Sequence, residues 1–550
     1  MVSPRFHSPG RFVARGLMAA AQALFATTIA WSAGPEVHSF LPAGGQRGTT
    51  VDVTVGGKLP NWPVQTWVDG AGLTLSAKEE KGKLSLVIAA DAVPGTRWIR
   101  VYDAAGASAP IPFIIGTLPE TLETEPNDAP SAAQSPMTPS LVANGRLAKR
   151  GDVDLWPVTL RQGQTLVASL AAHESLGSPV DAVMQIISAG GQTLAYNHDQ
   201  RGLDPQLTFV APADGTYLVR LFGFPSTPNQ TIGLAGGDSY VYRLTLATGP
   251  FVDYCWPLAV TRGREASVEL VGWNIADDER KVTIATHEDE FLIADARLAN
   301  TASVHVEPHE TMAEAELNGP TAAQSITLPV TITGRIEAPG DTDAFSFVGK
   351  KGEPLSFELV SRELGYPLDA VLQVLDADGK QLARVDDLGA ARDPSLTFTP
   401  PADATFRLLV QDLNAAGSSR HVYRLQARKP EPTFEATASG HAFEVSADKP
   451  AEISLAIDRR HGFAAEIAFQ VEGLPEFVSA ASAVSAGSGD TAKSVKLTLT
   501  STGGSFSGPV RIVGQSQGAL ALTRAATAVI PNHTVRCQQL WLTVVPAKAP

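Results

Sequence analysis

The sequence predicts an all-β chain of tandem β-sandwiches, and three observations support this prediction. The chain of 550 residues is too long for one hydrophobic core, and at about 150 residues per domain it should hold about three to five. Its 48 glycines and 39 prolines supply many turns, and short runs of alternating apolar residues lie between them. Two long stretches also occur twice, which indicates duplicated folding units.

Residues 1–33 carry the pattern of a secretory signal peptide. Arg5, Arg11 and Arg15 precede a short apolar run, 16–30, that ends in small residues. Cleavage after Ala30 or Ala33 fits; an uncleaved anchor is the alternative, although the run is shorter than the ~20 residues that span a bilayer. We therefore expect an exported chain that is secreted, periplasmic or at the cell surface, with no transmembrane segment after signal cleavage.

The first repeated pair consists of residues 34–119 and 249–313. Alternation through Val51, Val53 and Val55 after a glycine-rich turn predicts a half-buried strand. Identical residues recur at one constant spacing, from Pro35 and Pro250 to Gly57 and Gly272. The two segments are similar to the small immunoglobulin-like (IPT/TIG-like) sandwiches of extracellular proteins. The second is shorter, and we expect it to lack a strand.

The second repeated pair consists of residues 120–248 and 314–429. Its landmarks recur in order: Glu-x-Glu-x-Asn, Gly-Asp-x-Asp, Pro-x-Asp-Ala-Val, Asp-Pro-x-Leu-Thr-Phe and a closing Tyr-Arg-Leu. This ordered set resembles the bacterial pre-peptidase C-terminal (PPC) domain, a jelly-roll-like β-sandwich appended to secreted peptidases and related to the collagen-binding modules of clostridial collagenases. The resemblance implies a module rather than a reaction.

The last segment, 430–550, alternates apolar runs with Gly, Ser and Pro turns. This pattern predicts a further immunoglobulin-like sandwich. The expected order is therefore a signal peptide, an immunoglobulin-like module, a PPC module, a short immunoglobulin-like module, a second PPC module and a C-terminal immunoglobulin-like module.

The composition and motifs exclude some classes of function. A net charge of −14 argues against nucleic-acid binding, which needs a basic face. The nucleophile motif G-x-S-x-G is absent, and His309-Glu310 lacks the second histidine of a metalloprotease helix. We expect no enzyme, with a catalytic site of dispersed residues as the alternative. Cys255 and Cys537 could pair, but two separate thiols are the simpler expectation.

Calcium is the cofactor that the acidic runs predict. Glu123, Glu125, Asn127 and Asp128 offer four side chains with oxygen ligands within six residues. In the related collagen-binding modules a run of this type resembles a calcium site, which implies these four residues, with Asp152 or Asp154 completing the shell. The alternative is that these motifs are ordinary turns whose side chains cap their own backbone.

The second copy predicts a weaker site. It retains the corresponding acidic residues and asparagine but has Gly319 where the first copy has Asp128. The retained residues are Glu314, Glu316, Asn318, Asp341 and Asp343.

Together these features predict an exported, non-catalytic binding or adhesion protein for extracellular protein or polysaccharide. An accessory or targeting subunit of a separately encoded secreted hydrolase and a structural spacer are the alternatives. Asp181 and Asp369 are expected to cap turns, and Trp156 and Tyr242 to be core aromatics. The candidates for polymer contact are Tyr196, Phe222, Phe224 and Tyr240.

Overall fold

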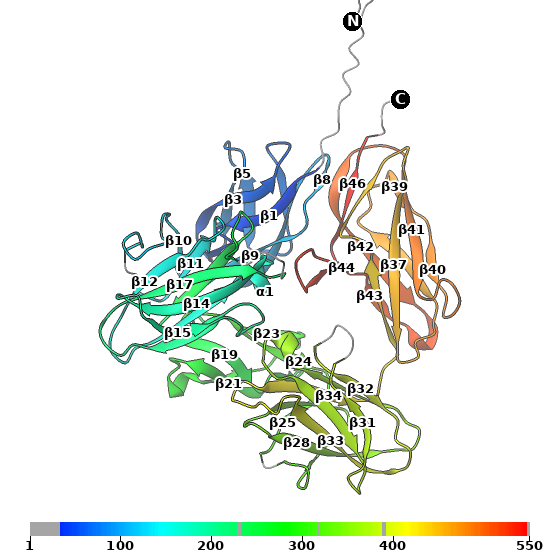
Figure 1. Ribbon diagram of the computed structural model, residues 1–550. Helices are drawn as coiled ribbons and strands as arrows, with labels where there is room; N and C mark the ends of the chain where they lie inside the picture. The colour runs from blue at the N-terminus through cyan, green and yellow to red at the C-terminus, as the bar shows by residue number, and fades with distance from the viewer. Residues whose placement is uncertain (1–33, 136, 228–232, 317, 388–391, 547–550) are drawn as a thin grey trace, which may run out of the picture. The chain divides into compact units, whose positions relative to one another are not determined.

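The structure is a computed structural model that describes residues 34–135, 137–227, 233–316, 318–387 and 392–546 (Figure 1). The expected signal peptide, with its cleavage after Ala30 or Ala33, lies outside the described residues. Strands make up 53% of the structure and helices 3%, so the prediction of tandem β-sandwiches is confirmed. Within the described ranges, no helix is long and apolar enough to cross a membrane.

Each sheet takes all its strands from one of five stretches of chain: 36–116, 120–247, 251–307, 310–428 or 433–544. The period-2 burial of single strands explains why these stretches form sandwiches. In β3 (Thr50–Lys58), Val53 and Val55 are buried while Asp52 and Thr54 face solvent. Each stretch also has its own hydrophobic cluster.

The first sandwich packs the sheet β1-β3-β6-β5 against the sheet β2-β9-β7-β4, to which β8 is added. Its core joins Val53 and Leu84 of one sheet to Ile99 and Phe113 of the other. The remaining strands are β1 (Glu36–Leu41), β2 (Gly44–Gln46), β4 (Gln65–Val68), β5 (Leu73–Ala77), β6 (Lys83–Ile88), β7 (Gly95–Asp103), β8 (Gly106–Ala107) and β9 (Ile111–Gly116).

The second sandwich packs the sheet β10-β11-β18-β13-β16 against the sheet β12-β17-β14-β15. Trp156, Met184 and Val219 meet Leu166 and Leu244 in its core. Its elements are β10 (Glu120–Leu122), β11 (Leu141–Arg146), β12 (Asp154–Leu160), β13 (Thr165–Ala171), α1 (His173–Leu176), β14 (Val180–Ser188), β15 (Thr193–Asn197), β16 (Gln206–Val210), β17 (Gly215–Pro225) and β18 (Val241–Ala247).

The third sandwich is smaller, with the three-stranded sheets β19-β21-β22 and β20-β24-β23. Val268 and Val304 join the two sheets in its core, where Cys255 is also buried. Its elements are β19 (Phe251–Trp256), β20 (Ala259–Thr261), β21 (Ala266–Trp273), η1 (Asp277–Glu279), β22 (Lys281–Ile284), β23 (Glu290–Ile293) and β24 (Ala302–Glu307).

The fourth sandwich repeats the strand order of the second. Its sheets are β25-β27-β34-β29-β32 and β26-β28-β33-β30-β31, in which only β26 has no named counterpart. β25 precedes the expected start at Glu314 but pairs with β27, so this sandwich begins at Glu310. Its elements are β25 (Glu310–Ala313), β26 (Gln324–Ser325), β27 (Val330–Arg335), β28 (Thr342–Gly349), β29 (Leu355–Val360), η2 (Arg362–Leu364), β30 (Ala370–Leu375), β31 (Gln381–Val385), β32 (Ser395–Phe398), β33 (Ala404–Asp412) and β34 (Val422–Arg428).

The fifth sandwich packs the sheet β35-β37-β41-β39 against the sheet β36-β46-β42-β38-β40, to which β43 is added. Cys537 is half-buried here, and both cysteines are free thiols. Its elements are β35 (Thr433–Ala438), β36 (Ala442–Val445), β37 (Ala451–Arg460), β38 (Ile467–Glu472), β39 (Val478–Ala480), β40 (Ala483–Ser485), β41 (Ser494–Ser501), β42 (Phe506–Ser516), η3 (Gly518–Leu520), β43 (Thr523–Ala525), β44 (Ala528–Val529), β45 (Arg536–Cys537) and β46 (Leu540–Val544).

Candidate metal centre

The acidic run of the second sandwich folds against the turn that leads into β12. β10 pairs in parallel with β11, and the Glu123 amide continues this pairing by donating to the Asn144 carbonyl at 2.9 Å. Between β11 and β12 the chain turns at Gly151, whose φ of 88° favours glycine. This turn carries Asp152 and Asp154 back toward the acidic run.

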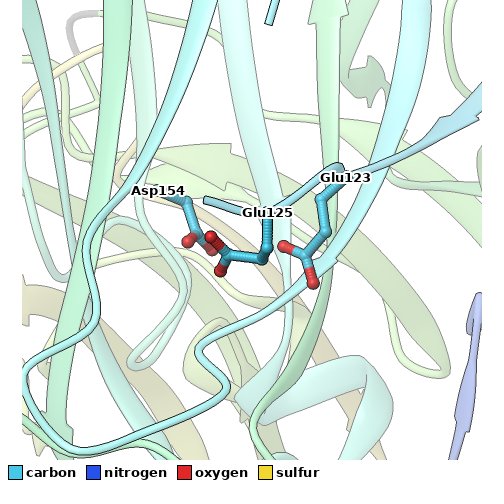
Figure 2. Close-up of side chains that lie close together, drawn as sticks. All are labelled: Glu123, Glu125 and Asp154. Carbon is cyan, nitrogen blue, oxygen red and sulfur yellow. The ribbon is translucent and has the colours of Figure 1, made fainter. Parts of the chain in front are cut away.

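Three carboxylates meet at this point. Ligand oxygens of Glu123, Glu125 and Asp154 all lie within 4.8 Å of one another, and Figure 2 shows the three side chains converging. Among the described residues, this is the one group of three or more acidic, histidine or cysteine side chains close enough to share an ion. Carboxylate oxygens at this spacing suit a hard cation such as calcium.

Buried oxygen atoms without hydrogen-bond partners belong to the cluster and to residues beside it in the sequence. They are Glu123 Oε2, Asn127 Oδ1 and Asp154 Oδ1, together with Asp152 Oδ1, which makes no hydrogen bond but lies 3.5 Å from Lys149 Nζ. The Asn127 side chain is 1% exposed and its amide nitrogen also has no partner. Each unsatisfied buried polar group costs about 1–3 kcal/mol. A cation is a ligand that satisfies several such oxygens at once, so the residues present fit calcium.

Burial, and after it the negative charge of neighbouring carboxylates, raises the pKa values of the cluster. Burial, with repulsion from Glu125 and Asp152, raises the pKa of Glu123 to about 7. Burial and the neighbouring Glu123 raise the pKa of Asp154 to about 8. Burial and Asp152 likewise raise the pKa of Glu125. A cation would reverse these shifts, since it favours the charged form of each carboxyl.

Asp128 and Lys149 form the exposed edge of the site. Lys149 Nζ lies 3.3 Å from Asp128 Oδ2 and 3.5 Å from Asp152 Oδ1. The Val153 amide donates to Asp128 Oδ1 at 3.3 Å. Asp128 would therefore have to lose its contact with Lys149 in order to bind an ion. Asn127 and Asp154 each have a side-chain oxygen that makes no hydrogen bond.

Two residues of the site were not predicted from the sequence in these roles. The Tyr242 hydroxyl donates to Asp154 Oδ2 at 2.6 Å and accepts from Trp156 Nε1 at 2.9 Å, so Tyr242 orients a candidate ligand as well as filling the core. Lys149 supplies a positive charge. The role of Tyr242 could have been found from the sequence, because Tyr242 and Asp154 recur together in the second copy as Tyr423 and Asp343. No sequence pattern indicated the role of Lys149.

The second copy is built differently. Both Asp341 carboxylate oxygens accept backbone hydrogen bonds at 2.8 Å, from Glu337 and Thr342. The Tyr423 hydroxyl donates to Asp343 Oδ2 at 2.6 Å. Burial and the adjacent Asp343 raise the pKa of Glu314, as burial also does for Glu123 and Asp154 in the first copy.

The other predicted ligands of the second copy add little to it. Glu316 is exposed. Asn318 is 4% exposed and its Nδ2 has no partner. Gly319 leaves open space where the first copy has Asp128. The second copy therefore provides fewer free oxygen atoms than the first.

The four aromatic residues predicted to contact a polymer differ in their exposure to solvent. Tyr196 and Phe224 are 66% and 40% exposed, and Phe222 is half-buried on the same strand as Phe224. Tyr240 instead packs against the core of the second sandwich. Asp181 is the second residue of β14 and lies opposite Phe224.

Comparison with known proteins gives a local likeness. No family model matches the chain. A probable subtilase-type serine protease of Deinococcus radiodurans is 35% identical over 104 residues, which are 18% of this chain and 14% of the protease. The matched stretch is thus a small part of that relative's length.

One solved structure with a similar part is the pre-peptidase C-terminal domain of a collagenase from Bacillus anthracis. The two chains are 16% identical, the match covers 19% of this chain and 93% of that chain, and the TM-score is 0.16. Another is a Bacteroides ovatus protein, SGBP-B of a mixed-linkage glucan utilization locus, solved with a heptasaccharide. Its identity is 12%, its coverage 70% of this chain and 72% of its own, and its TM-score 0.13. At these TM-scores neither likeness decides fold or function.

Proposed function

We propose that this protein is an exported, non-catalytic binding protein whose second sandwich holds one calcium ion and whose β-sandwich surfaces bind extracellular protein or polysaccharide. The observation that carries the calcium part is the set of three buried, unpartnered oxygens at Glu123, Asn127 and Asp154. The binding part is supported by the modular β-architecture and by exposed aromatic side chains on the second sandwich.

The chain's own residues would hold the ion from two segments. Glu123, Glu125 and Asn127 come from the entry to the sandwich, Asp152 comes from the turn before β12, and Asp154 is the first residue of β12. Bound calcium would supply a positive charge that joins these two segments. Tyr242 keeps the Asp154 carboxylate oriented by its hydrogen bond, and Asn127 has a buried oxygen that is not used by the backbone.

A calcium ion shared by these two segments would make the chain more rigid where it enters the second sandwich. The segment between β10 and β11 is attached to the sandwich by few backbone hydrogen bonds, one of them from the Glu123 amide to Asn144. A shared ion adds several contacts between this segment and the β12 turn. A binding module whose entry segment is fixed loses less conformational entropy when it binds a polymer.

An accessory subunit of a secreted peptidase is the second candidate function. The observation that favours it is the similarity over 104 residues to part of a probable subtilase-type protease, a length that suits one module. In that case the sandwiches would position a separately encoded enzyme or its substrate.

The test is a pull-down of residues 34–550 against insoluble proteins and polysaccharides, in calcium and in EDTA. Binding that is stronger in calcium supports both parts of the proposal, and equal binding in both buffers supports binding without a role for calcium. Failure to bind any polymer, combined with co-purification of a hydrolase from the native source, would favour the accessory subunit.

A further inference from the structure

The outer face of the sheet β12-β17-β14-β15 in the second sandwich carries two exposed aromatic side chains, Tyr196 and Phe224, and the half-buried Phe222. Phe222 and Phe224 lie on β17, and their ring centroids are 6.4 Å apart with an angle of 78° between the rings. Tyr196 lies on β15, with β14 between the two strands. Two strand spacings correspond to about 10 Å across the sheet. The rings therefore flank a strip of β14 that is one strand wide.

The register of the strands puts these side chains on one face. Gln185 of β14 lies opposite Arg220 of β17 and opposite Tyr196 of β15, and Asp181 lies opposite Phe224. Directly opposed residues of antiparallel strands point to the same side of the sheet. We call the face defined by these five residues, together with Phe222 and Val183, the aromatic face.

The fourth sandwich shows that the fold does not require these aromatic rings. There Val371 of β30 lies opposite Gln411, and Gln373 lies opposite Arg384. Gln411 therefore holds the position of Phe222, and Arg384 that of Tyr196. Leu413, whose amide donates to the Asp369 carbonyl, holds the position of Phe224. The same scaffold is thus built with a glutamine, an arginine and a leucine.

Polar groups lie between and beside the rings. Arg220 Nε donates to Gln185 Oε1 at 2.8 Å. His198 Nδ1 lies 2.6 Å from Asp199 Oδ2. Burial and the nearby Asp199 raise the pKa of Asp181, which indicates that the two carboxyl groups face one region. The aromatic face therefore combines apolar ring surfaces with an amide, a guanidinium and carboxylates.

We propose that the aromatic face binds a neutral polysaccharide laid across β17, β14 and β15. Pyranose rings present C–H groups that pack on aromatic rings, and their hydroxyl groups bond to carboxylate and amide side chains such as Asp181 and Gln185. The centre of a protein–protein interface is depleted of aspartate, and an apolar partner would bury Asp181 without a hydrogen bond. The inference rests on the proposed binding function and names its ligand class.

The test uses residues 34–550 and three polysaccharide probes: insoluble cellulose, insoluble chitin and xylan. Insoluble collagen and casein are the protein probes. The variant replaces each aromatic residue by its counterpart in the fourth sandwich: Phe222→Gln, Phe224→Leu and Tyr196→Arg. Because the fourth sandwich tolerates these residues, the variant should fold, which circular dichroism verifies. Arg384→Ala is the matched control on the fourth sandwich.

We expect the wild-type protein and the Arg384→Ala control to bind at least one polysaccharide, and the triple variant to bind it at least ten-fold more weakly. Equal binding by the folded triple variant would overturn the inference. Binding to collagen or casein alone would also overturn it, while leaving the proposed function in place. Binding to none of the five probes would contradict both.

Discussion

Removal of calcium is expected to loosen the two segments that form the candidate site. The size of this effect follows from the linkage between binding and stability. We call the state in which the two segments are in contact the closed state. If calcium binds only this state, a free calcium concentration 100 times the dissociation constant stabilises the closed state by about 2.7 kcal/mol. The structure provides the reason for tight binding, because each pKa unit corresponds to about 1.4 kcal/mol. Moving the pKa of Glu123 from 4.5 to about 7 therefore represents about 3 kcal/mol of uncompensated charge burial.

Hydrogen–deuterium exchange followed by mass spectrometry measures this opening directly. Peptides that cover residues 123–128 and 146–154 should exchange about 100-fold more slowly in calcium than in EDTA. The corresponding region of the fourth sandwich, 314–343, is an internal control and should change less, because both Asp341 oxygens already accept backbone hydrogen bonds. Equal exchange of residues 123–154 in the two buffers would refute the reasoning.

Three further predictions concern the same site. Without calcium, the raised pKa values of Glu123 (about 7) and Asp154 (about 8) mean that the folded state holds more protons than the unfolded state. The part of the stability that these two carboxyls contribute should thus be fully present below about pH 4 and be lost as the pH rises through about 7 to 8; calorimetry in EDTA that shows the opposite trend for this contribution would contradict the prediction. Asn127→Ala removes an unpartnered buried oxygen and should weaken calcium binding at least ten-fold in isothermal titration, whereas unchanged affinity would exclude Asn127 as a ligand. Gly319→Asp adds a carboxylate where the structure has open space and should increase the calcium protection of residues 314–343 in hydrogen exchange.

The fold was predictable because its signals are local and repeated. The alternation of Val51, Val53 and Val55 marks a strand without any knowledge of its partner. The sequence motifs that occur twice predict two domains of the same fold, and the second and fourth sandwiches do share one strand order. The start of the fourth sandwich at Glu310 was missed, because β25 is recognised as a strand of that sandwich only by its pairing with β27.

The candidate site was predictable only in part. The run Glu123 to Asp128 is visible in the sequence, but the burial of Asn127 depends on how the β12 turn packs against it. The role of Tyr242 depends on a hydrogen bond between positions 88 residues apart.

The calcium content of the purified chain tests the central claim most directly. Residues 34–550 and the variant Asp154→Asn are dialysed against buffered calcium and analysed by mass spectrometry for bound metal. The account predicts one tightly bound calcium in the wild-type protein that is lost in the variant, since Asp154 is a fully buried carboxylate with an unpartnered oxygen. A wild-type protein that retains no calcium, or a variant that retains as much, would contradict it.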